Sequence, residues 1–337
     1  MEQVFPVIDA KGEIPSRERV DQAVRSWGTI PGYVRMFGLG YAALVTQQDR
    51  SRWVDLLRLS DDELVTSWRR RIDEADIPTT AEVVAKLRKA GVRRVCVHSI
   101  QPLEGGEWNY QASNDEVGML VQKHPDFVLG FANANIFDGA EAIAEIKRAH
   151  HELGLIGMKV TPPFFKLYAD DELLIPFYRL AEELGIIVWL HCGNHWRSEF
   201  VMDATHPVRV DRVACRFPNL RIIAGHAGWP WVLDAVVMSW RHKNVYLDTS
   251  AHRPKYLGKA GSGWEPLIQY GKSTIKDKVL FGSSWDILGR PMTTLVEEVR
   301  GLPLGDSVAK AWLYGNAARL FGLPELKTLE TDQAAWH

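Results

Sequence analysis

The chain has 337 residues, 40 basic and 42 acidic side chains, and a formal net charge of -2. This near balance gives no electrostatic attraction to nucleic acid or to an anionic membrane, so we expect neither as a partner. No apolar run reaches the roughly 18 residues of a membrane span and no signal peptide is recognisable, and three widely spaced cysteines suit reduced thiols, so the sequence predicts a cytoplasmic protein.

Short apolar segments rich in β-branched residues recur along the chain and predict β-strands. There are eight of these segments, at residues 4–9, 92–99, 127–132, 156–160, 186–191, 220–224, 245–248 and 279–282. Amphipathic helical patterns lie between them, at residues 81–90, 138–153, 173–184, 204–216 and 230–241. Strands that alternate with helices in this way indicate parallel β–α–β units.

Eight such units in a chain of this length predict an α/β fold, a distorted (β/α)8 TIM barrel. An open, doubly wound sheet is the alternative, but no glycine-rich dinucleotide-binding turn follows the first strand. The first connection, residues 14–80, is far longer than a usual crossover. Within it we expect helices at 17–26, 41–59 and 61–75 and a turn at Pro31-Gly32, which together form an insertion or lid over the barrel mouth.

The remaining sequence predicts one domain over residues 1–323, which includes the insertion, and a surface extension at 324–337. In a parallel barrel the active site forms at the carboxyl ends of the strands. Lys11 and Glu13 follow the first predicted strand, and Asp286 follows the last. His191 and His226 end or follow apolar strands beside glycine, which favours an active-site role for both over a packing role.

Four groups of segments resemble the amidohydrolase superfamily: VIDAKGE, LGLIGMKVTPPFF, VWLHCGNHW with IIAGHAGWPW, and LFGSSWD followed by WLYGNAARLFGL. The resemblance is to the branch of aminocarboxymuconate-semialdehyde decarboxylase and the γ-resorcylate-type decarboxylases. It covers residues 4–323, with 14–80 poorly matched. It implies a distorted barrel that holds one divalent metal, commonly zinc or manganese, and a dimer, because members of this branch are commonly dimeric.

The resemblance also implies roles for individual residues. His191 matches the metal ligand after the fifth strand, and His226 matches the catalytic histidine after the sixth. The ligand pair after the first strand falls on Lys11 and Glu13, and the aspartate after the eighth falls on Ser284. Three of the four usual metal ligands are therefore replaced in this chain.

Three interpretations of this altered site remain open. In the one we favour, no metal is needed: the Lys11 ammonium pairs with Glu13 or Asp286 and stabilises an oxyanion or enolate, while His191 or His226 moves the proton. In the second, Glu13, His191 and Asp286 hold one zinc or manganese ion, with His226 as acid or base. In the third, catalysis is lost and the chain is a binding or scaffold protein.

Further polar and aromatic residues near the strand ends are expected to bind substrate. Lys159 interrupts an apolar strand, where a charge is costly unless it is paired or functional. The expected substrate-binding set is Lys159, His98, Ser284, Trp196, Trp229 and Arg290. The sequence thus predicts a lyase or hydrolase (decarboxylase, hydratase or lactonase) that acts on a small aromatic or unsaturated carboxylate as a homodimer. A serine hydrolase built from Ser284, His226 and Asp286 is disfavoured, because the chain has no G-x-S-x-G elbow.

Overall fold

Eight parallel strands form the centre of the molecule, and hydrogen-bonded neighbours follow one another in chain order. The structure is a computed structural model that describes residues 5–99, 110–195 and 200–324. The strands are β1 (Val7–Gly12), β2 (Val92–His98), β3 (Val128–Ala132), β4 (Gly157–Val160), β5 (Ile187–His191), β6 (Ile222–Gly225), β7 (Val245–Asp248) and β8 (Val279–Leu280). The backbone N–H of Ala10 in β1 donates to the carbonyl of Phe281 beyond β8 at 2.8 Å, which links the last strand to the first. The predicted TIM barrel is confirmed.

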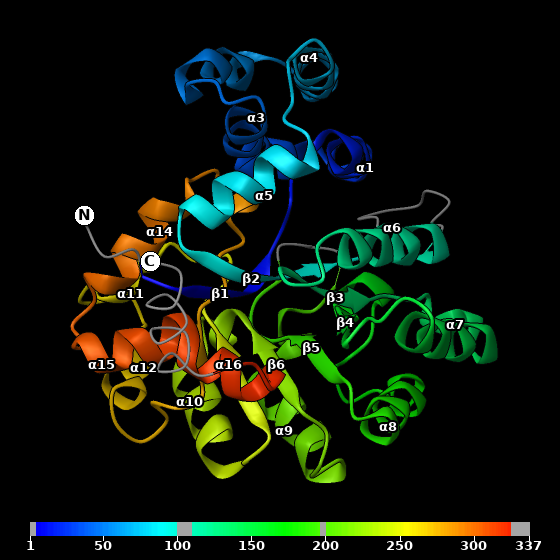
Figure 1. Cartoon of the computed structure of the whole chain (residues 1–337), viewed down its shortest axis with the longest axis vertical. Coiled ribbons are helices and arrows are strands. Elements are labelled where there is room, and N and C mark those ends of the chain that lie inside the picture. Colours follow the sequence, from blue (N-terminus) through cyan, green and yellow to red (C-terminus); the bar gives the residue numbers. More distant parts are fainter. Residues whose placement is uncertain (1–4, 100–109, 196–199, 325–337) are drawn as a thin grey trace, which may run out of the picture.

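Helices surround the barrel and connect its strands (Figure 1). They are α1 (Arg17–Trp27), α2 (Pro31–Tyr33), α3 (Leu39–Val45), α4 (Asp61–Asp73), α5 (Thr80–Lys89), α6 (Tyr110–Lys123), α7 (Ala140–His151), α8 (Ile175–Leu184), α9 (Pro207–Arg216), α10 (Val232–Arg241), α11 (Pro254–Leu257), α12 (Glu265–Gly271), α13 (Trp285–Leu288), α14 (Met292–Arg300), α15 (Asp306–Lys310) and α16 (Asn316–Phe321). Among the described residues, no helix combines the length and apolar character needed to cross a bilayer.

The interior of the barrel is filled by apolar side chains from alternate strand positions, as the two-residue period of a strand requires. Contributors from the strands are Ile8, Ala10, Cys96, Phe131, Ile187, Trp189, Ile223 and Leu280. Trp189 is two residues before His191 on β5, so both side chains point the same way. The Trp189 indole therefore forms the floor beneath the polar groups at the carboxyl ends of the strands.

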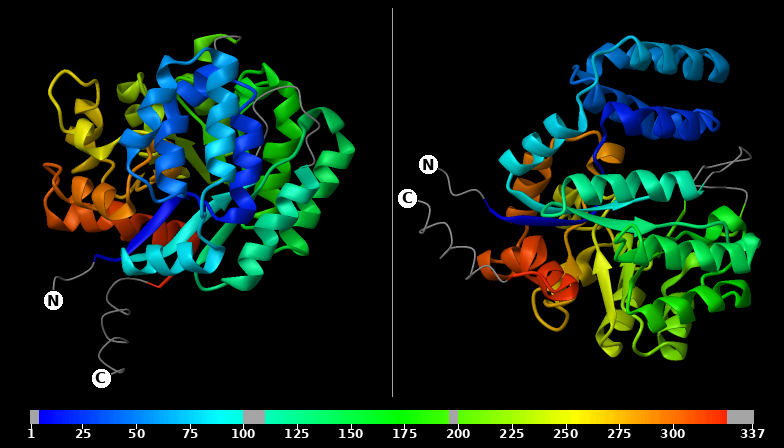
Figure 2. Two further views of the ribbon diagram at one scale, coloured as in Figure 1. Left: turned by 90° about the horizontal axis from the view of Figure 1, so that it is seen from above. Right: turned by 45° about the vertical axis from the view of Figure 1, so that its right-hand side comes forward.

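The helices between β1 and β2 have a hydrophobic core of their own, which includes Trp53, Trp68 and Tyr41. In Figure 1 α1, α3 and α4 lie together beyond the ring of barrel helices, and Figure 2 shows the same grouping from two other directions. The expected turn at Pro31-Gly32 is instead the helix α2, and the expected helix 41–59 is two elements. α3 ends at Val45, and a 3₁₀ helix occupies Arg50–Arg58 after Asp49 caps its first turn.

Two other boundaries differ from the sequence-based expectation. α9 begins at Pro207, because proline favours the first turn of a helix and cannot continue one from the preceding residues. β1 extends to Gly12 rather than ending at Asp9. Lys11 is therefore part of the strand. Of the expected extension 324–337, all but Pro324 lies outside the described residues, and its boundary stays a prediction.

Candidate active site

The junction of β8 with β1 fixes the backbone that carries Lys11. The buried Asp9 carboxylate accepts hydrogen bonds from the backbone N–H of Ser283 at 2.8 Å, from the Ser283 hydroxyl at 2.5 Å and from the backbone N–H of Lys11 at 3.2 Å. Burial raises the pKa of Asp9 to about 6. A Cβ at Gly12 would clash with this carboxylate, so only glycine fits between Lys11 and Glu13. Asp9 is thus a structural clamp between the two strands.

A pocket of about 720 Å³, counted out to its open mouth, lies between the strand ends and the helical insertion. The barrel supplies Lys11, Glu13, His98, Ser99, Lys159, Phe164, Asp286 and Ile287 to its lining, and Pro15 comes from the start of the insertion. The insertion supplies Arg19, Ala23, Ser26, Trp27, Tyr33 and Tyr41. The volume suits a small organic molecule, and the lining combines cations, two carboxyl groups and aromatic walls.

Two lysine ammonium groups border the floor of the pocket. The Lys11 Nζ lies 5.8 Å from the centroid of the Trp189 ring, within the range of a cation–π contact. Within the described part of the chain Lys11 forms no ion pair closer than 4.0 Å, but its charge acts on Asp286 and opposes the rise in the pKa of that carboxyl group. The expected pairing of Lys11 with Glu13 or Asp286 stays a prediction. Desolvation, followed by the charge of Lys11, lowers the pKa of Lys159 to about 7.

Glu13 is bound to a residue that the sequence did not single out. The buried guanidinium of Arg19, on α1, donates from Nε and Nη2 to the two carboxylate oxygens of Glu13 at 2.7 and 2.8 Å. Arg19 Nη2 also donates to the carbonyl of His98 at 3.1 Å, and the backbone N–H of Ile14 donates to Glu13 at 2.7 Å. Both oxygens of Glu13 are therefore engaged, and removing one partner of such a buried pair costs about 3–5 kcal/mol.

His191 and His226 pack against each other next to the pocket, with ring centroids 4.8 Å apart. His226 Nδ1 lies 3.0 Å from the carbonyl of Ser250, which can only accept, so Nδ1 carries the proton and Nε2 is bare. Thr205 donates its own proton to Gly193 and therefore accepts from His191 Nδ1 at 3.3 Å. Burial lowers the pKa of both imidazoles, so both are neutral near pH 7.

Several buried polar atoms at the mouth of the barrel have no hydrogen-bond partner among the residues that the structure describes. They are Arg19 Nη1 and the hydroxyls of Thr161, Thr249 and Ser284. His98 stacks on Phe131 with centroids 4.6 Å apart, and burial lowers its pKa well below the usual value. Because buried polar groups are normally paired, this concentration of unpaired groups indicates that a polar ligand completes the site.

Asp286 is the carboxyl group that faces the pocket from α13. Burial, and after it the negative charge of Glu13, raises the pKa of Asp286 to about 6. The phenols of Tyr33 and Tyr41 line the pocket from the insertion, and burial together with the charge of Asp286 raises their pKa. Both phenols therefore stay protonated and can act as hydrogen-bond donors at neutral pH.

The structure brings together most of the residues expected at the site. Lys11, Glu13, His98, Lys159 and Asp286 line the pocket. His191, His226 and the buried Ser284 lie at neighbouring strand ends but outside its lining. Trp229 packs on His252 with centroids 5.3 Å apart, and neither Trp229 nor Arg290 lines the pocket, so the structure gives no support to a substrate-binding role for these two. Trp196 lies outside the described residues.

The insertion contributes the residues that sequence reasoning missed, namely Arg19, Trp27, Tyr33 and Tyr41. They lie in a segment that resembles the family poorly, and Arg19 is one of several arginines there. The sequence offered one signal for Arg19: it is a basic residue six positions after Glu13, on a predicted helix that follows the first strand directly.

The chain's own donors do not fit a divalent metal in this pocket. The ligand atoms of Glu13, His191 and Asp286 do not form a cluster within 4.8 Å of one another among the described residues. Glu13 is held by Arg19, and the Lys11 ammonium lines the same pocket. A protonated lysine offers no lone pair to a cation, and its charge repels one.

Comparison with known proteins places this barrel in a family. A model of the amidohydrolase family matches residues 94–323, which is more than half of the chain. The chain belongs to the amidohydrolase family. Curated relatives put it in the decarboxylase branch that the sequence segments indicated, so that expectation, and with it the expectation of an enzyme, is confirmed.

Three of the curated relatives are two decarboxylases and a hydratase. γ-Resorcylate decarboxylase of Polaromonas sp. (strain JS666) is 24% identical over 253 residues, 63% of this chain and 75% of the relative. 2-Amino-3-carboxymuconate-6-semialdehyde decarboxylase of Dictyostelium discoideum is 23% identical over 248 residues, 65% and 68% of the two chains. 2-Keto-4-carboxy-3-hexenedioate hydratase of Sphingobium sp. is 24% identical over 255 residues, 63% and 70%.

Solved structures agree on the fold. A dihydroxybenzoic acid decarboxylase from Polaromonas sp. JS666, with bound manganese and the inhibitor 2-nitroresorcinol, aligns with a TM-score of 0.62 at 17% identity, over 94% of this chain and 97% of that chain. The manganese and the inhibitor belong to that relative, and at 17% identity the likeness shows the fold.

Proposed function

We propose that this amidohydrolase is a non-oxidative decarboxylase of small aromatic or unsaturated carboxylic acids that carry a hydroxyl or oxo group next to the carboxylate. The observation that carries the proposal is the pocket lining, in which Lys11, Lys159 and Arg19 accompany two carboxyl groups, Asp286 and the Arg19-bound Glu13. Arg19 Nη1 has no hydrogen-bond partner among the described residues. Cations bind and orient an anionic substrate, and an acid beside it can protonate carbon. The aromatic walls, Trp27 and Phe164 among them, suit a planar molecule.

Each of these groups has a role in the release of CO2 from the substrate. Lys159 and Arg19 hold the acid, and Lys11 faces the adjacent oxygen. Asp286 donates its proton to the carbon that bears the carboxylate. The bond from that carbon to the carboxylate then breaks, CO2 leaves, and the electron pair returns to the ring and its oxygen, where the Lys11 ammonium stabilises the developing charge. Solvent returns a proton to Asp286, so the net reaction consumes one proton and releases CO2.

In this proposal Lys11 takes the electrostatic role that a metal would have. The support is the geometry: Lys11 lines the pocket above Trp189, and Glu13 is held by Arg19. The manganese in the related decarboxylase favours the alternative of one zinc or manganese ion on Glu13, His191 and Asp286. That alternative requires Glu13 to leave Arg19 and the strand end to shift.

Removing metals separates the two interpretations. Protein treated with a chelator and dialysed is expected to keep its full rate of CO2 release from hydroxybenzoates, because the positive charge belongs to the chain. Turnover with and without added Mn2+ or Zn2+, measured beside the metal content of the same sample, checks this. Loss of turnover on chelation and its recovery with Mn2+ would overturn the Lys11 proposal in favour of the metal-dependent one.

Lys159 predicts a pH dependence. Its pKa is lowered to about 7 by desolvation and by Lys11, so its charged form dominates below pH 7 and is lost above it. The kcat/KM for a carboxylate substrate is expected to fall as the pH rises through about 7, with an effect mainly on KM. In Lys159→Met the rise of KM with pH should disappear and KM should stay high throughout, whereas a KM profile like that of the wild type would contradict the assignment.

The hydratase among the relatives is a second candidate activity, since an acid that protonates one carbon of a double bond allows water to add to the other carbon, with loss of a proton to solvent. Measuring CO2 release against consumption of a double bond without CO2 distinguishes the two. A homodimer and a cytoplasmic location stay predictions, as does the role of the insertion as a lid. The three cysteines, Cys96, Cys192 and Cys215, are free thiols in the structure, as a reducing compartment would require.

A further inference from the structure

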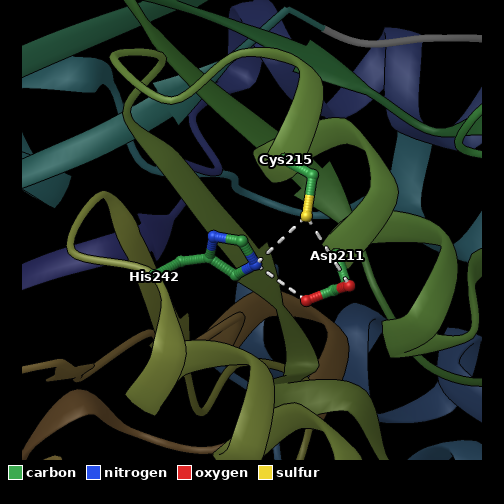
Figure 3. Close-up of side chains that lie close together, drawn as sticks. All are labelled: Asp211, Cys215 and His242. Carbon is green, nitrogen blue, oxygen red and sulfur yellow. Dashed lines mark hydrogen bonds and ion pairs between the residues drawn. The ribbon is translucent and has the colours of Figure 1, made fainter.

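Three potential ligands of different chemistry meet on the outside of the barrel, away from the pocket. Asp211 and Cys215 lie one turn apart on α9, and His242 directly follows the end of α10 (Figure 3). The connection from α10 to β7 runs at the amino ends of the strands, opposite the mouth that holds Lys11. Among the described residues this is the one group of three or more histidine, cysteine and acidic side chains with ligand atoms within 4.8 Å of one another.

The three side chains converge on a single point. His242 Nε2 lies 2.7 Å from Asp211 Oδ1 and 3.9 Å from Cys215 Sγ, and Cys215 Sγ lies 4.0 Å from Asp211 Oδ2. Tetrahedral ligands at zinc distances of about 2.0–2.3 Å lie about 3.3–3.6 Å apart, so shifts of a few tenths of an ångström would admit an ion. A nucleophilic triad would place the thiol and the carboxylate on opposite ring nitrogens. Here one nitrogen faces both.

We propose that Asp211, Cys215 and His242 form a binding site for a soft divalent cation such as Zn2+, separate from the pocket at the barrel mouth. Thiolate, imidazole and carboxylate are the ligands that zinc takes in proteins, and a fourth position remains for solvent. On binding, the Cys215 thiol releases its proton to solvent, the ring proton of His242 moves from Nε2 to Nδ1 by exchange with solvent, and sulfur–zinc and nitrogen–zinc bonds form. The charges of the thiolate and the Asp211 carboxylate then balance the two positive charges of the ion.

Two neighbouring basic residues affect the site: one holds the backbone at His242, and the other competes with a metal ion for Asp211. Lys278 Nζ donates to the carbonyls of His242 and Lys243 at 2.8 and 2.7 Å, which fixes the backbone that carries the imidazole. Arg241 Nη1 lies 3.3 Å from the Asp211 carboxylate and competes with a cation for it. The Arg241 side chain is 58% exposed, so it can turn into solvent when the ion binds. An ion here would tie α9 to the α10–β7 connection and stabilise the fold by mass action.

Cobalt gives a direct test on the full chain. Chelator-treated protein titrated with CoCl2 is expected to develop the near-ultraviolet charge-transfer band of a cobalt thiolate, and ZnCl2 should abolish the band by displacing cobalt. Cys215→Ser should lose the band, because Cys96 and Cys192 are buried in the core. Zinc is expected to raise the melting temperature of the wild type and not that of Cys215→Ser.

A matched pair of histidine variants completes the test. His242→Ala should weaken zinc binding at least tenfold, since even outer-shell partners of a ligand are worth about 10–100-fold, whereas His151→Ala, at an exposed position on α7, should bind zinc like the wild type. The rate of CO2 release by Cys215→Ser should match that of the wild type. This result would distinguish the zinc site from any metal site in the pocket. Absence of the cobalt band in the wild type, its persistence in Cys215→Ser, or equal zinc affinity in the two histidine variants would overturn the proposal.

Discussion

Replacing Lys11 by methionine is expected to lower kcat/KM for CO2 release by a factor on the order of 10³, the upper range for losing one electrostatic contact to a developing oxyanion. Methionine keeps the unbranched shape over the Trp189 ring and removes only the charge, which lies 5.8 Å from that ring in the wild type. Steady-state turnover of hydroxybenzoates measures the loss, and an unchanged melting temperature shows that the fold is intact.

Lys86→Met provides the control, because Lys86 is exposed on α5 and does not line the pocket. It should have wild-type kinetics. Adding Mn2+ or Zn2+ to Lys11→Met is expected to restore little, since Glu13 stays paired with Arg19 and the neighbouring donors do not converge. A variant with near wild-type turnover would show that the charge of Lys11 has no part in the reaction.

The barrel could be predicted because an apolar strand segment recurs eight times along the chain. The end of the first strand could not be predicted. The apolar run stops at Asp9, so the sequence suggested that the strand ends there. The strand continues to Gly12 because Asp9 is buried as an acceptor for Ser283 and for the backbone of Lys11. That pairing joins residues 274 positions apart, which a local pattern cannot reveal.

The candidate site was predictable to the extent that the topology brings strand ends together. His98, Lys159 and Asp286 reach the same pocket because parallel strands deliver their last residues to one edge. The partner of Glu13 was not predictable in this way. Arg19 belongs to the insertion, and only the course of α1 over the barrel mouth places its guanidinium against that carboxylate.

Replacing Asp286 by asparagine is expected to lower kcat by a factor of about 10²–10⁴, the usual contribution of a positioned general acid, with little change in KM. The amide keeps the size of the carboxyl group and cannot donate the proton to carbon. In D2O the wild type should place one deuterium on the carbon that loses CO2. Asp306→Asn, at an exposed position on α15, is the matched control and should behave like the wild type.

We expect Asp286 to supply the proton to carbon because His226 is a poorer proton donor at this site. Near pH 7 His226 is neutral, its Nδ1 proton is engaged by the carbonyl of Ser250, and its Nε2 carries a lone pair that can accept a proton but not give one. Asp286 has a pKa of about 6 because it is buried near Glu13, so its protonated form is retained below that pH and declines above it. The kcat of the wild type should therefore fall as the pH rises beyond about 6. If His226→Asn removes this dependence and Asp286→Asn does not, the proton comes from the imidazole and the two residues exchange roles.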